Sequence, residues 1–202
     1  ISVTSTVGGE GKTFTAVNLG AIIAMSKKKV IIVDLDMRKP RVHLSFGDSN
    51  PNKGVSTLLI GKDTMEECIV KSRIDNLDYI NAGPTPPNPS ELLLNGEFDN
   101  FIDRLKRTYD LIILDTQTDG LVTDGILAMK KADLAIYIVR ANYSKREFLK
   151  TLSRVITVNH FKNIAVVLNA LQSQRTNNYG YGYGYYDNDP KKSNSLLSKL
   201  FS

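Results

Sequence analysis

The stretch Ile1-Ser-Val-Thr-Ser-Thr-Val-Gly-Gly-Glu-Gly-Lys-Thr13 opens the chain and decides the fold that we expect. Its first five residues are typical of a short buried strand, and the apolar residues of 14–25 recur at helical spacing. A Gly-rich turn between a strand and a helix points backbone N–H groups at phosphate oxygens, and the N-terminus of the helix attracts negative charge. The pattern therefore predicts a phosphate-binding loop, although Thr6 stands where the common motif G-x-x-x-x-G-K-[ST] has its first glycine.

The end of this loop carries two side chains that would act on a bound nucleotide. Lys12 can bridge the β- and γ-phosphates, and the Thr13 hydroxyl can bind Mg²⁺. The alternative is a Gly-rich turn without a ligand, but the strand before it and the helix after it favour the nucleotide site. The residues that we expect to contact the nucleotide here are Gly8, Gly9, Glu10, Gly11, Lys12, Thr13 and Phe14.

Strands and helices alternate along the rest of the chain. Beyond Ile1–Ser5, apolar runs predict strands at Val30–Val33, Leu77–Ile80, Leu111–Leu114, Leu134–Val139 and Ile164–Leu168. Helical spacing predicts helices at Phe14–Met25, Ser90–Lys106 (with Ser90 as N-cap), Thr123–Lys131 and Lys145–Val158. This alternation is typical of an α/β fold in which helices cover both faces of a parallel sheet.

Composition excludes several other classes of protein. The 202 residues suffice for one large domain, and 42% hydrophobic with 23% charged residues is ordinary for a globular protein. The single cysteine, Cys68, excludes a disulfide framework within the chain, and no apolar run reaches the roughly 18 residues of a membrane-spanning helix. The net charge of +5 permits an anionic partner. Nucleic-acid binding is not predicted, because the sequence shows no basic face with interleaved aromatic residues. Because the chain starts inside a strand and not at a methionine, we expect a piece of a longer protein.

Three carboxylates follow predicted strands. Asp34 and Asp36 come after the strand at 30–33, and Asp115 comes after the strand at 111–114. Ligands of open α/β sheets bind at the carboxyl ends of the strands, where such carboxylates support Mg²⁺ or accept a hydroxyl proton. A D-x-D pair alone is usually a solvated strand end. Its position one strand–helix unit after a phosphate loop favours a Mg-nucleotide site.

Other polar and aromatic side chains allow weaker interpretations. The cations Arg38, Lys39 and Arg41 either bind phosphate or a neighbouring subunit, or form a solvated loop. His43 and His160 have no metal ligand at suitable spacing and are interpreted as structural. Four tyrosines in or beside regular elements are interpreted as packing residues: Tyr79, Tyr109, Tyr137 and Tyr143.

Two motifs carry a resemblance to a known family. Val30–Arg38 (VIIVDLDMR) resembles the extra Walker motif of bacterial tyrosine kinases, and Gly83–Leu93 (GPTPPNPSELL) is similar to their G-x-x-P-P-N-P-x-E-L-L stretch. The resemblance runs from the first residue to about Asn169 and resumes in the tyrosine-rich C-terminus. It departs at Asp115-Thr-Gln-Thr118, where the family has D-T-P-P, and we expect the loss of both prolines to leave that loop more flexible.

The resemblance implies a P-loop kinase that transfers the γ-phosphoryl group of ATP to protein tyrosines. It also implies that this kinase regulates capsule and exopolysaccharide polymerisation and export. It implies a polysaccharide co-polymerase membrane protein as partner or fused upstream domain, a ring-shaped homo-oligomer, and a place at the cytoplasmic face of the bacterial inner membrane. Carried over by position, the catalytic set is Lys12, Asp34, Asp36 and Asp115. In this set Asp34 would accept the tyrosine proton, while Thr13, Asp36 and Asp115 would organise Mg²⁺. Asn169 would recognise adenine.

The C-terminal segment 172–202 is predicted to be a flexible tail outside a kinase domain of residues 1–171. Its polar, low-complexity sequence carries five tyrosines within eight residues. The resemblance implies that these are the phosphoacceptors, in the same or a neighbouring subunit: Tyr179, Tyr181, Tyr183, Tyr185 and Tyr186. The alternative is a sticky tether without a modified residue.

Two other functions remain open at this point. The ATPases that position division sites and partition plasmids share the expected fold, but their loop has a signature lysine where this chain has Val7. A nucleotide-binding scaffold without kinase activity would keep every phosphate-binding residue. The Tyr-Gly tail favours the kinase, because a simple tether would be rich in Ser or Gly.

Overall fold

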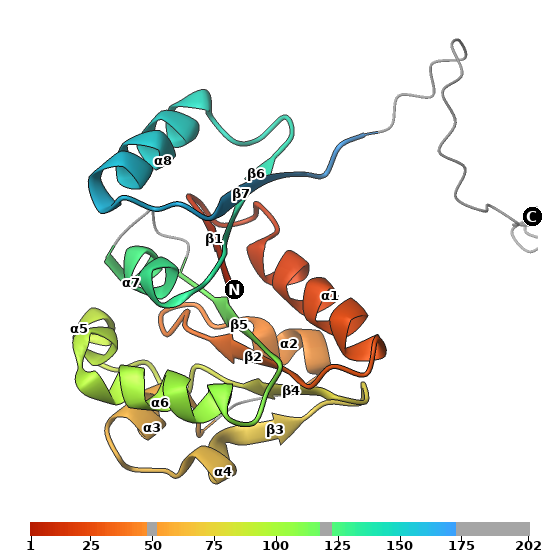
Figure 1. The fold of residues 1–202 in the computed structure, drawn as a ribbon, viewed down its shortest axis with the longest axis vertical. Helices are drawn as coiled ribbons and strands as arrows, with labels where there is room; N and C mark the ends of the chain where they lie inside the picture. Colours follow the sequence, from red (N-terminus) through yellow and green to blue (C-terminus); the bar gives the residue numbers. More distant parts are fainter. Residues whose placement is uncertain (48–51, 118–122, 173–202) are drawn as a thin grey trace, which may run out of the picture. The chain divides into compact units, whose positions relative to one another are not determined.

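One seven-stranded sheet organises the described residues, which are 1–47, 52–117 and 123–172 of the computed structural model (Figure 1). The strand order is β3-β4-β2-β5-β1-β6-β7, and neighbouring strands run parallel except β3, which pairs antiparallel with β4 at one edge. The strands are β1 (Ser2–Ser5), β2 (Val30–Asp34), β3 (Ile69–Lys71), β4 (Leu77–Ile80), β5 (Leu111–Asp115), β6 (Ala135–Arg140) and β7 (Ile164–Asn169). The predicted parallel sheet is confirmed. The edge strand β3 is an addition that the apolar pattern did not indicate.

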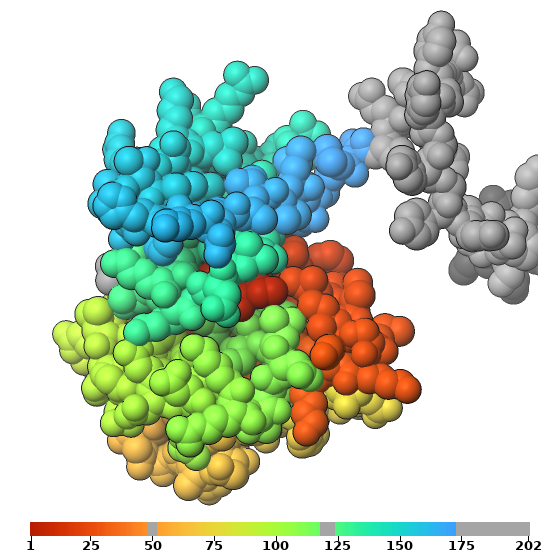
Figure 2. All heavy atoms as spheres, viewed as in Figure 1, coloured from red at the N-terminus to blue at the C-terminus, as the bar shows by residue number. Residues whose placement is uncertain are grey.

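Helices cover both faces of the sheet (Figure 1). Helices α1 and α2 pack on one face, and α3 to α7 pack on the other. The helices are α1 (Lys12–Met25), α2 (Val42–Phe46), α3 (Val55–Leu59), α4 (Met65–Cys68), α5 (Pro89–Leu94), α6 (Gly96–Lys106), α7 (Thr123–Lys131) and α8 (Arg146–Asn159). In the space-filling view, α6 and α7 form a continuous surface over their face (Figure 2).

Strand β2 lies inside the sheet, between β4 and β5, and is buried on both faces, as its unbroken apolar run predicts. Ile31 and Val33 pack toward the face covered by α6, and Val30 and Ile32 pack toward α1. This alternation follows from the two-residue period of a strand. Because β2 is held from both sides, the residues that follow it start from a fixed position.

Helix α1 approaches the sheet closely because its inner stripe is made of small residues. Ala16, Gly20 and Ala24 are buried at a spacing of four residues. A Cβ atom on Gly20 would lie 3.0 Å from Cδ1 of Ile32, so the Ile32 side chain would have to shift to admit a larger residue there. The close packing places the first turn of α1 beside the carboxyl ends of β1 and β5.

The predicted helix at 90–106 is wrong in one detail. It is two helices, because Asn95 adopts an extended conformation (φ −75°, ψ 145°) between α5 and α6. Helix α5 begins at Pro89, whose fixed φ suits the first helical position, so Asn88 and not Ser90 precedes the helix.

Ile1–Leu171 forms one compact unit. All of the predicted tail except Gln172 lies outside the described residues, so the tail and its boundary stay predictions. Within the described chain, no helix combines the length and apolarity that crossing a bilayer requires.

Candidate active site

The predicted phosphate loop lies between β1 and α1 at the carboxyl edge of the sheet. Gly9 and Gly11 have φ values of +85° and +97°, a left-handed conformation that favours glycine. The loop borders a cavity of about 520 Å³. Every residue of the predicted nucleotide set from Gly8 to Phe14 lines this cavity, together with Ser5, Asp36, Lys39 and Arg41. The structure therefore brings the predicted set together around one opening.

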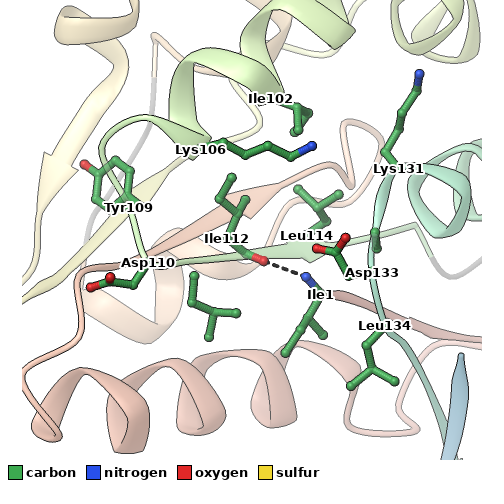
Figure 3. Close-up of a pocket in the computed structure, with 12 residues that line it drawn as sticks. Ile1, Ile102, Lys106, Tyr109, Asp110, Ile112, Leu114, Lys131, Asp133 and Leu134 are labelled. Atoms are coloured by element: carbon green, nitrogen blue, oxygen red, sulfur yellow. Dashed lines mark hydrogen bonds between the residues drawn. The ribbon is translucent and has the colours of Figure 1, made fainter.

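A larger cavity of about 610 Å³ lies at the opposite, amino edge of the strands (Figure 3). The amino group of Ile1 donates there to the carbonyl of Ile112 at 2.8 Å, with Lys106, Lys131 and Asp133 around it (Figure 3). This cavity borders no Gly-rich loop. We therefore place the candidate site at the smaller cavity, where a helix begins and the strands end.

Asp115 connects the two functional side chains of the phosphate loop. Its Oδ1 atom lies 2.7 Å from Nζ of Lys12, and its Oδ2 atom accepts a hydrogen bond from the Thr13 hydroxyl at 2.7 Å. Lys12 and Asp115 are both buried, with 4% and 0% of their surface exposed. A phosphate entering the cavity would compete with Asp115 for the ammonium group, so the arrangement is one that a nucleotide can reorganise.

Asp34 lies beneath the cavity and not on its wall. Its Oδ1 atom accepts from the backbone N–H of Asp36 at 3.0 Å, and its Oδ2 atom accepts from those of Arg41 and Val42 at 3.2 and 3.1 Å. The carboxylate thereby folds the segment after β2 back upon itself. Burial, and then the charge of Asp115, raise the pKa of Asp34 from its ordinary value of 3.8 to about 7.

Asp36 is the carboxylate of the D-x-D pair that lines the cavity. Its Oδ1 atom accepts from the backbone N–H of Lys39 at 3.0 Å, and burial raises its pKa. Asp36 therefore shares the cavity with Lys12 and Thr13.

The raised pKa of Asp34 predicts how stability depends on pH. A carboxyl group that holds its proton more tightly when folded adds stability that is complete below pH 4 and is lost as the pH rises through about 7. We expect the unfolding free energy of the ligand-free protein to fall across this window, by at most about 1.4 kcal/mol per pH unit from this group. We would measure the unfolding free energy by denaturant titration at pH 5, 6 and 7. It should change less with pH in the Asp34→Asn variant than in the wild-type protein. Equal changes with pH in the two proteins would contradict this, whatever their absolute stabilities.

The loop that departs from the family pattern is tied at its start by a side-chain network. Gln117 is buried, and in the amide orientation that satisfies both neighbours it donates to Oδ2 of Asp124 at 2.9 Å and accepts from Nε of Arg38 at 3.3 Å. It thereby links the segment after β2 to the start of α7. The flexibility expected from the missing prolines is thus opposed at Gln117, and residues 118–122 lie outside the described chain.

Asn169, the predicted adenine-recognition residue, lies at the end of β7 behind the phosphate loop. Its Nδ2 atom donates to the carbonyl of Glu10 at 3.0 Å. Asn169 does not line the cavity, so its role toward adenine stays a prediction. The five predicted phosphoacceptors, residues 179–186, lie outside the described residues.

The donor set fits Mg²⁺ bound together with phosphate. The described residues contain no group of three or more His, Cys, Asp or Glu side chains that could hold a metal by themselves. Mg²⁺ is usually bound by one or two carboxylates with substrate phosphates and water, so such a group is not required. Thr13, Asp36 and Asp115 are the residues that would hold it.

Comparison with known proteins places the chain in a family. The model of a family described as AAA domain matches residues 1–168. The Bacillus subtilis tyrosine-protein kinase YwqD is 31% identical over 180 residues, which cover 89% of this chain and 76% of YwqD. The chain belongs to the bacterial tyrosine-kinase family. The resemblance seen in the sequence is therefore confirmed.

Two further members of the bacterial tyrosine-kinase family show the extent of the match. The Salmonella typhimurium tyrosine-protein kinase Wzc is 35% identical over 184 residues, which cover 90% of this chain but only 25% of Wzc. The kinase domain of the Escherichia coli tyrosine kinase ETK has a TM-score of 0.80 at 29% identity, covering 91% of this chain and 72% of that domain. The P-loop fold expected from the sequence is therefore confirmed.

Proposed function

We propose that this protein transfers the γ-phosphoryl group of ATP to tyrosines, and that the acceptors are Tyr179, Tyr181, Tyr183, Tyr185 and Tyr186 of its own or a neighbouring subunit. The observation that carries the proposal is the contact of Asp115, at the end of β5, with Lys12 and Thr13 at the start of α1, which share their cavity with Asp36. These are the groups that a P-loop enzyme uses to hold a nucleotide and its metal.

The reaction requires position and charge more than covalent chemistry by the protein. The N-terminus of α1 and the loop N–H groups bind the phosphate oxygens, and Lys12 stabilises the charge on the transferred group. Bound Mg²⁺ would neutralise charge on the β- and γ-phosphates. The tyrosine oxygen forms a bond to the γ-phosphorus as the bond from that phosphorus to the β–γ bridging oxygen breaks. ADP leaves with the electron pair, and the phenol proton passes to a carboxylate.

Asp34 and Asp36 are the two candidates for this proton acceptor. The family resemblance assigns the role to Asp34, but both oxygens of Asp34 accept backbone hydrogen bonds and its side chain is fully buried. Asp36 lines the cavity beside the phosphate loop and keeps 6% of its surface exposed, whereas Asp34 keeps none. The geometry therefore favours Asp36 as the acceptor and Asp34 as the residue that shapes the segment holding it.

Variants of the two carboxylates separate these roles. We expect Asp36→Asn to lower the rate of phosphoryl transfer about 10²- to 10⁴-fold at saturating Mg-ATP, and to remove the acid-side limb of its pH profile. Asp34→Asn should lower stability and weaken transfer less, with the limb retained. Single-turnover rates measured from pH 5 to 9 compare the two variants. If Asp34→Asn removes the acid-side limb of the pH–rate profile and Asp36→Asn does not, then Asp34 is the proton acceptor.

The cellular part of the proposal rests on membership of the family. We propose that the kinase regulates capsule or exopolysaccharide polymerisation and export at the cytoplasmic face of the bacterial inner membrane. Its partner would be a polysaccharide co-polymerase membrane protein, separate or fused upstream, and the parent protein would form a ring. The 25% coverage of Wzc supports a longer parent.

Intact-mass spectrometry of the protein after incubation with Mg-ATP tests the proposed activity. Successive mass increases of one phosphate each, mapped by fragmentation to residues 179–186, are the expected result. Bound nucleotide without added phosphate, even with the upstream segment or partner supplied, would favour the scaffold. Phosphate found only outside residues 179–186 would contradict the proposed acceptors.

A further inference from the structure

The carbonyl groups of the phosphate loop are held by side chains from distant parts of the chain. The Tyr143 hydroxyl donates to the carbonyl of Gly8 at 2.8 Å, and Nη1 of Arg140 donates to that of Gly9 at 2.9 Å. The carbonyl of Glu10, the next residue, accepts from Asn169. Three consecutive carbonyls are thus bonded to donors that do not line the nucleotide cavity.

Peptide geometry gives these contacts a consequence for the opposite side of the loop. In a planar trans peptide, the carbonyl of one residue and the N–H of the next point in opposite directions. Holding the carbonyls of residues 8, 9 and 10 away from the cavity therefore turns the N–H groups of residues 9, 10 and 11 toward it. Those N–H groups are the ones that a phosphate would meet.

The segment Arg140–Ser144, between β6 and α8, is itself internally braced. The backbone N–H of Arg140 donates to the Ser144 hydroxyl at 2.7 Å, and the Arg140 guanidinium lies 5.3 Å from the centre of the Tyr143 ring. The Ser144 hydroxyl also bonds to the buried carboxylate of Glu10. The other Glu10 oxygen accepts the N–H groups of residues 6 and 7 at 2.8 and 2.9 Å. The segment and the loop thus form one connected network.

We propose that Arg140–Ser144 is a brace that sets the conformation of the phosphate loop, and that Tyr143 and Arg140 are positioning residues for binding the nucleotide phosphates. The inference rests on the proposed nucleotide site and is independent of which tyrosines accept phosphate. The Tyr143 side chain is half exposed, so its hydroxyl contributes little to the core and is available for this role. The position of Tyr143 beside a regular element predicts a packing role, and the brace gives this residue a second role.

Tyr143→Phe is the sharpest test, because it removes one hydroxyl and keeps the ring. Affinities are measured for ADP directly and for pyrophosphate by competition against a fluorescent ADP analogue, both at one fixed Mg²⁺ concentration. The loss of one neutral hydrogen bond should weaken both ligands by the same factor, about 3- to 10-fold. The matched control is Tyr109→Phe, whose hydroxyl bonds Asp78 away from the loop and should leave both affinities unchanged.

The two ligands distinguish the brace from other roles of Tyr143. Equal weakening of ADP and pyrophosphate, with the melting temperature of the ligand-free protein within about a degree of wild type, supports the brace. Unchanged affinities would overturn it, and weakening of ADP alone would overturn it in favour of a contact with adenine or ribose. Failure of the wild-type protein to bind ADP would contradict the nucleotide site itself, which is a separate result.

Discussion

Replacing Lys12 with methionine should lower the rate of phosphate incorporation from Mg-ATP by about 10²- to 10³-fold or more. Methionine keeps the length of the side chain and removes its charge. The ammonium group belongs to the first residue of α1 and lies buried, 2.7 Å from Oδ1 of Asp115, and Lys12 is the only cation in the loop sequence of residues 6–13. Intact-mass spectrometry over a time course measures the rate.

The controls for this variant must separate lost chemistry from lost folding. Lys12→Met leaves Asp115 as a buried charge without its partner, which is destabilising. The double variant Lys12→Met/Asp115→Asn removes that charge and should melt at a higher temperature than the single variant while staying inactive. Lys28→Met, an exposed lysine after α1, should keep the wild-type rate. A Lys12→Met protein that incorporates phosphate at the wild-type rate would exclude the proposed role of Lys12.

Local sequence patterns predicted the parts of the site that lie close together in the chain. The strand, the Gly-rich turn and the helix of residues 1–25 are contiguous, so spacing and turn chemistry determine them. Asp115 was also predicted, because an apolar strand ends there and ligands of open α/β sheets bind at the carboxyl ends of the strands. Its pairing with both Lys12 and Thr13 depends on coordinates that no local pattern contains.

The features that the sequence did not predict depend on long-range contacts or on single backbone conformations. Tyr143 and Gly8 are separated by 135 residues, and nothing near either residue indicates their hydrogen bond. The burial of Asp34 follows from the return of the chain at Arg41 and Val42, whereas a strand-end carboxylate is usually solvated. The break at Asn95 is a change of one residue's ψ angle within an otherwise helical pattern.

The predicted phosphoacceptors are tested by changing the five tyrosines of residues 179–186 to phenylalanine together. We expect nearly all phosphate incorporation to be lost while the affinity for Mg-ADP stays at the wild-type value, because the substitutions leave the cavity residues in place. Phenylalanine substitution is preferable to truncation after Leu171, since a truncated end would lie two residues from Asn169, which bonds to the loop. Phosphate incorporated at the wild-type level would show that the acceptors lie elsewhere.

A mixture of two variants, neither of which can phosphorylate itself, then shows whether phosphoryl transfer occurs between subunits. The variant with five phenylalanines keeps the catalytic residues but lacks acceptors, and Lys12→Met keeps the acceptors but lacks the essential cation. If a neighbouring subunit supplies the acceptor, the Lys12→Met chain in the mixture should gain phosphate at a rate that rises with total protein concentration. If each chain modifies only itself, neither mass should change. Intact-mass spectrometry resolves the two chains, and the first result would also require that two copies meet at the cavity bordered by Gly8 and Asp36.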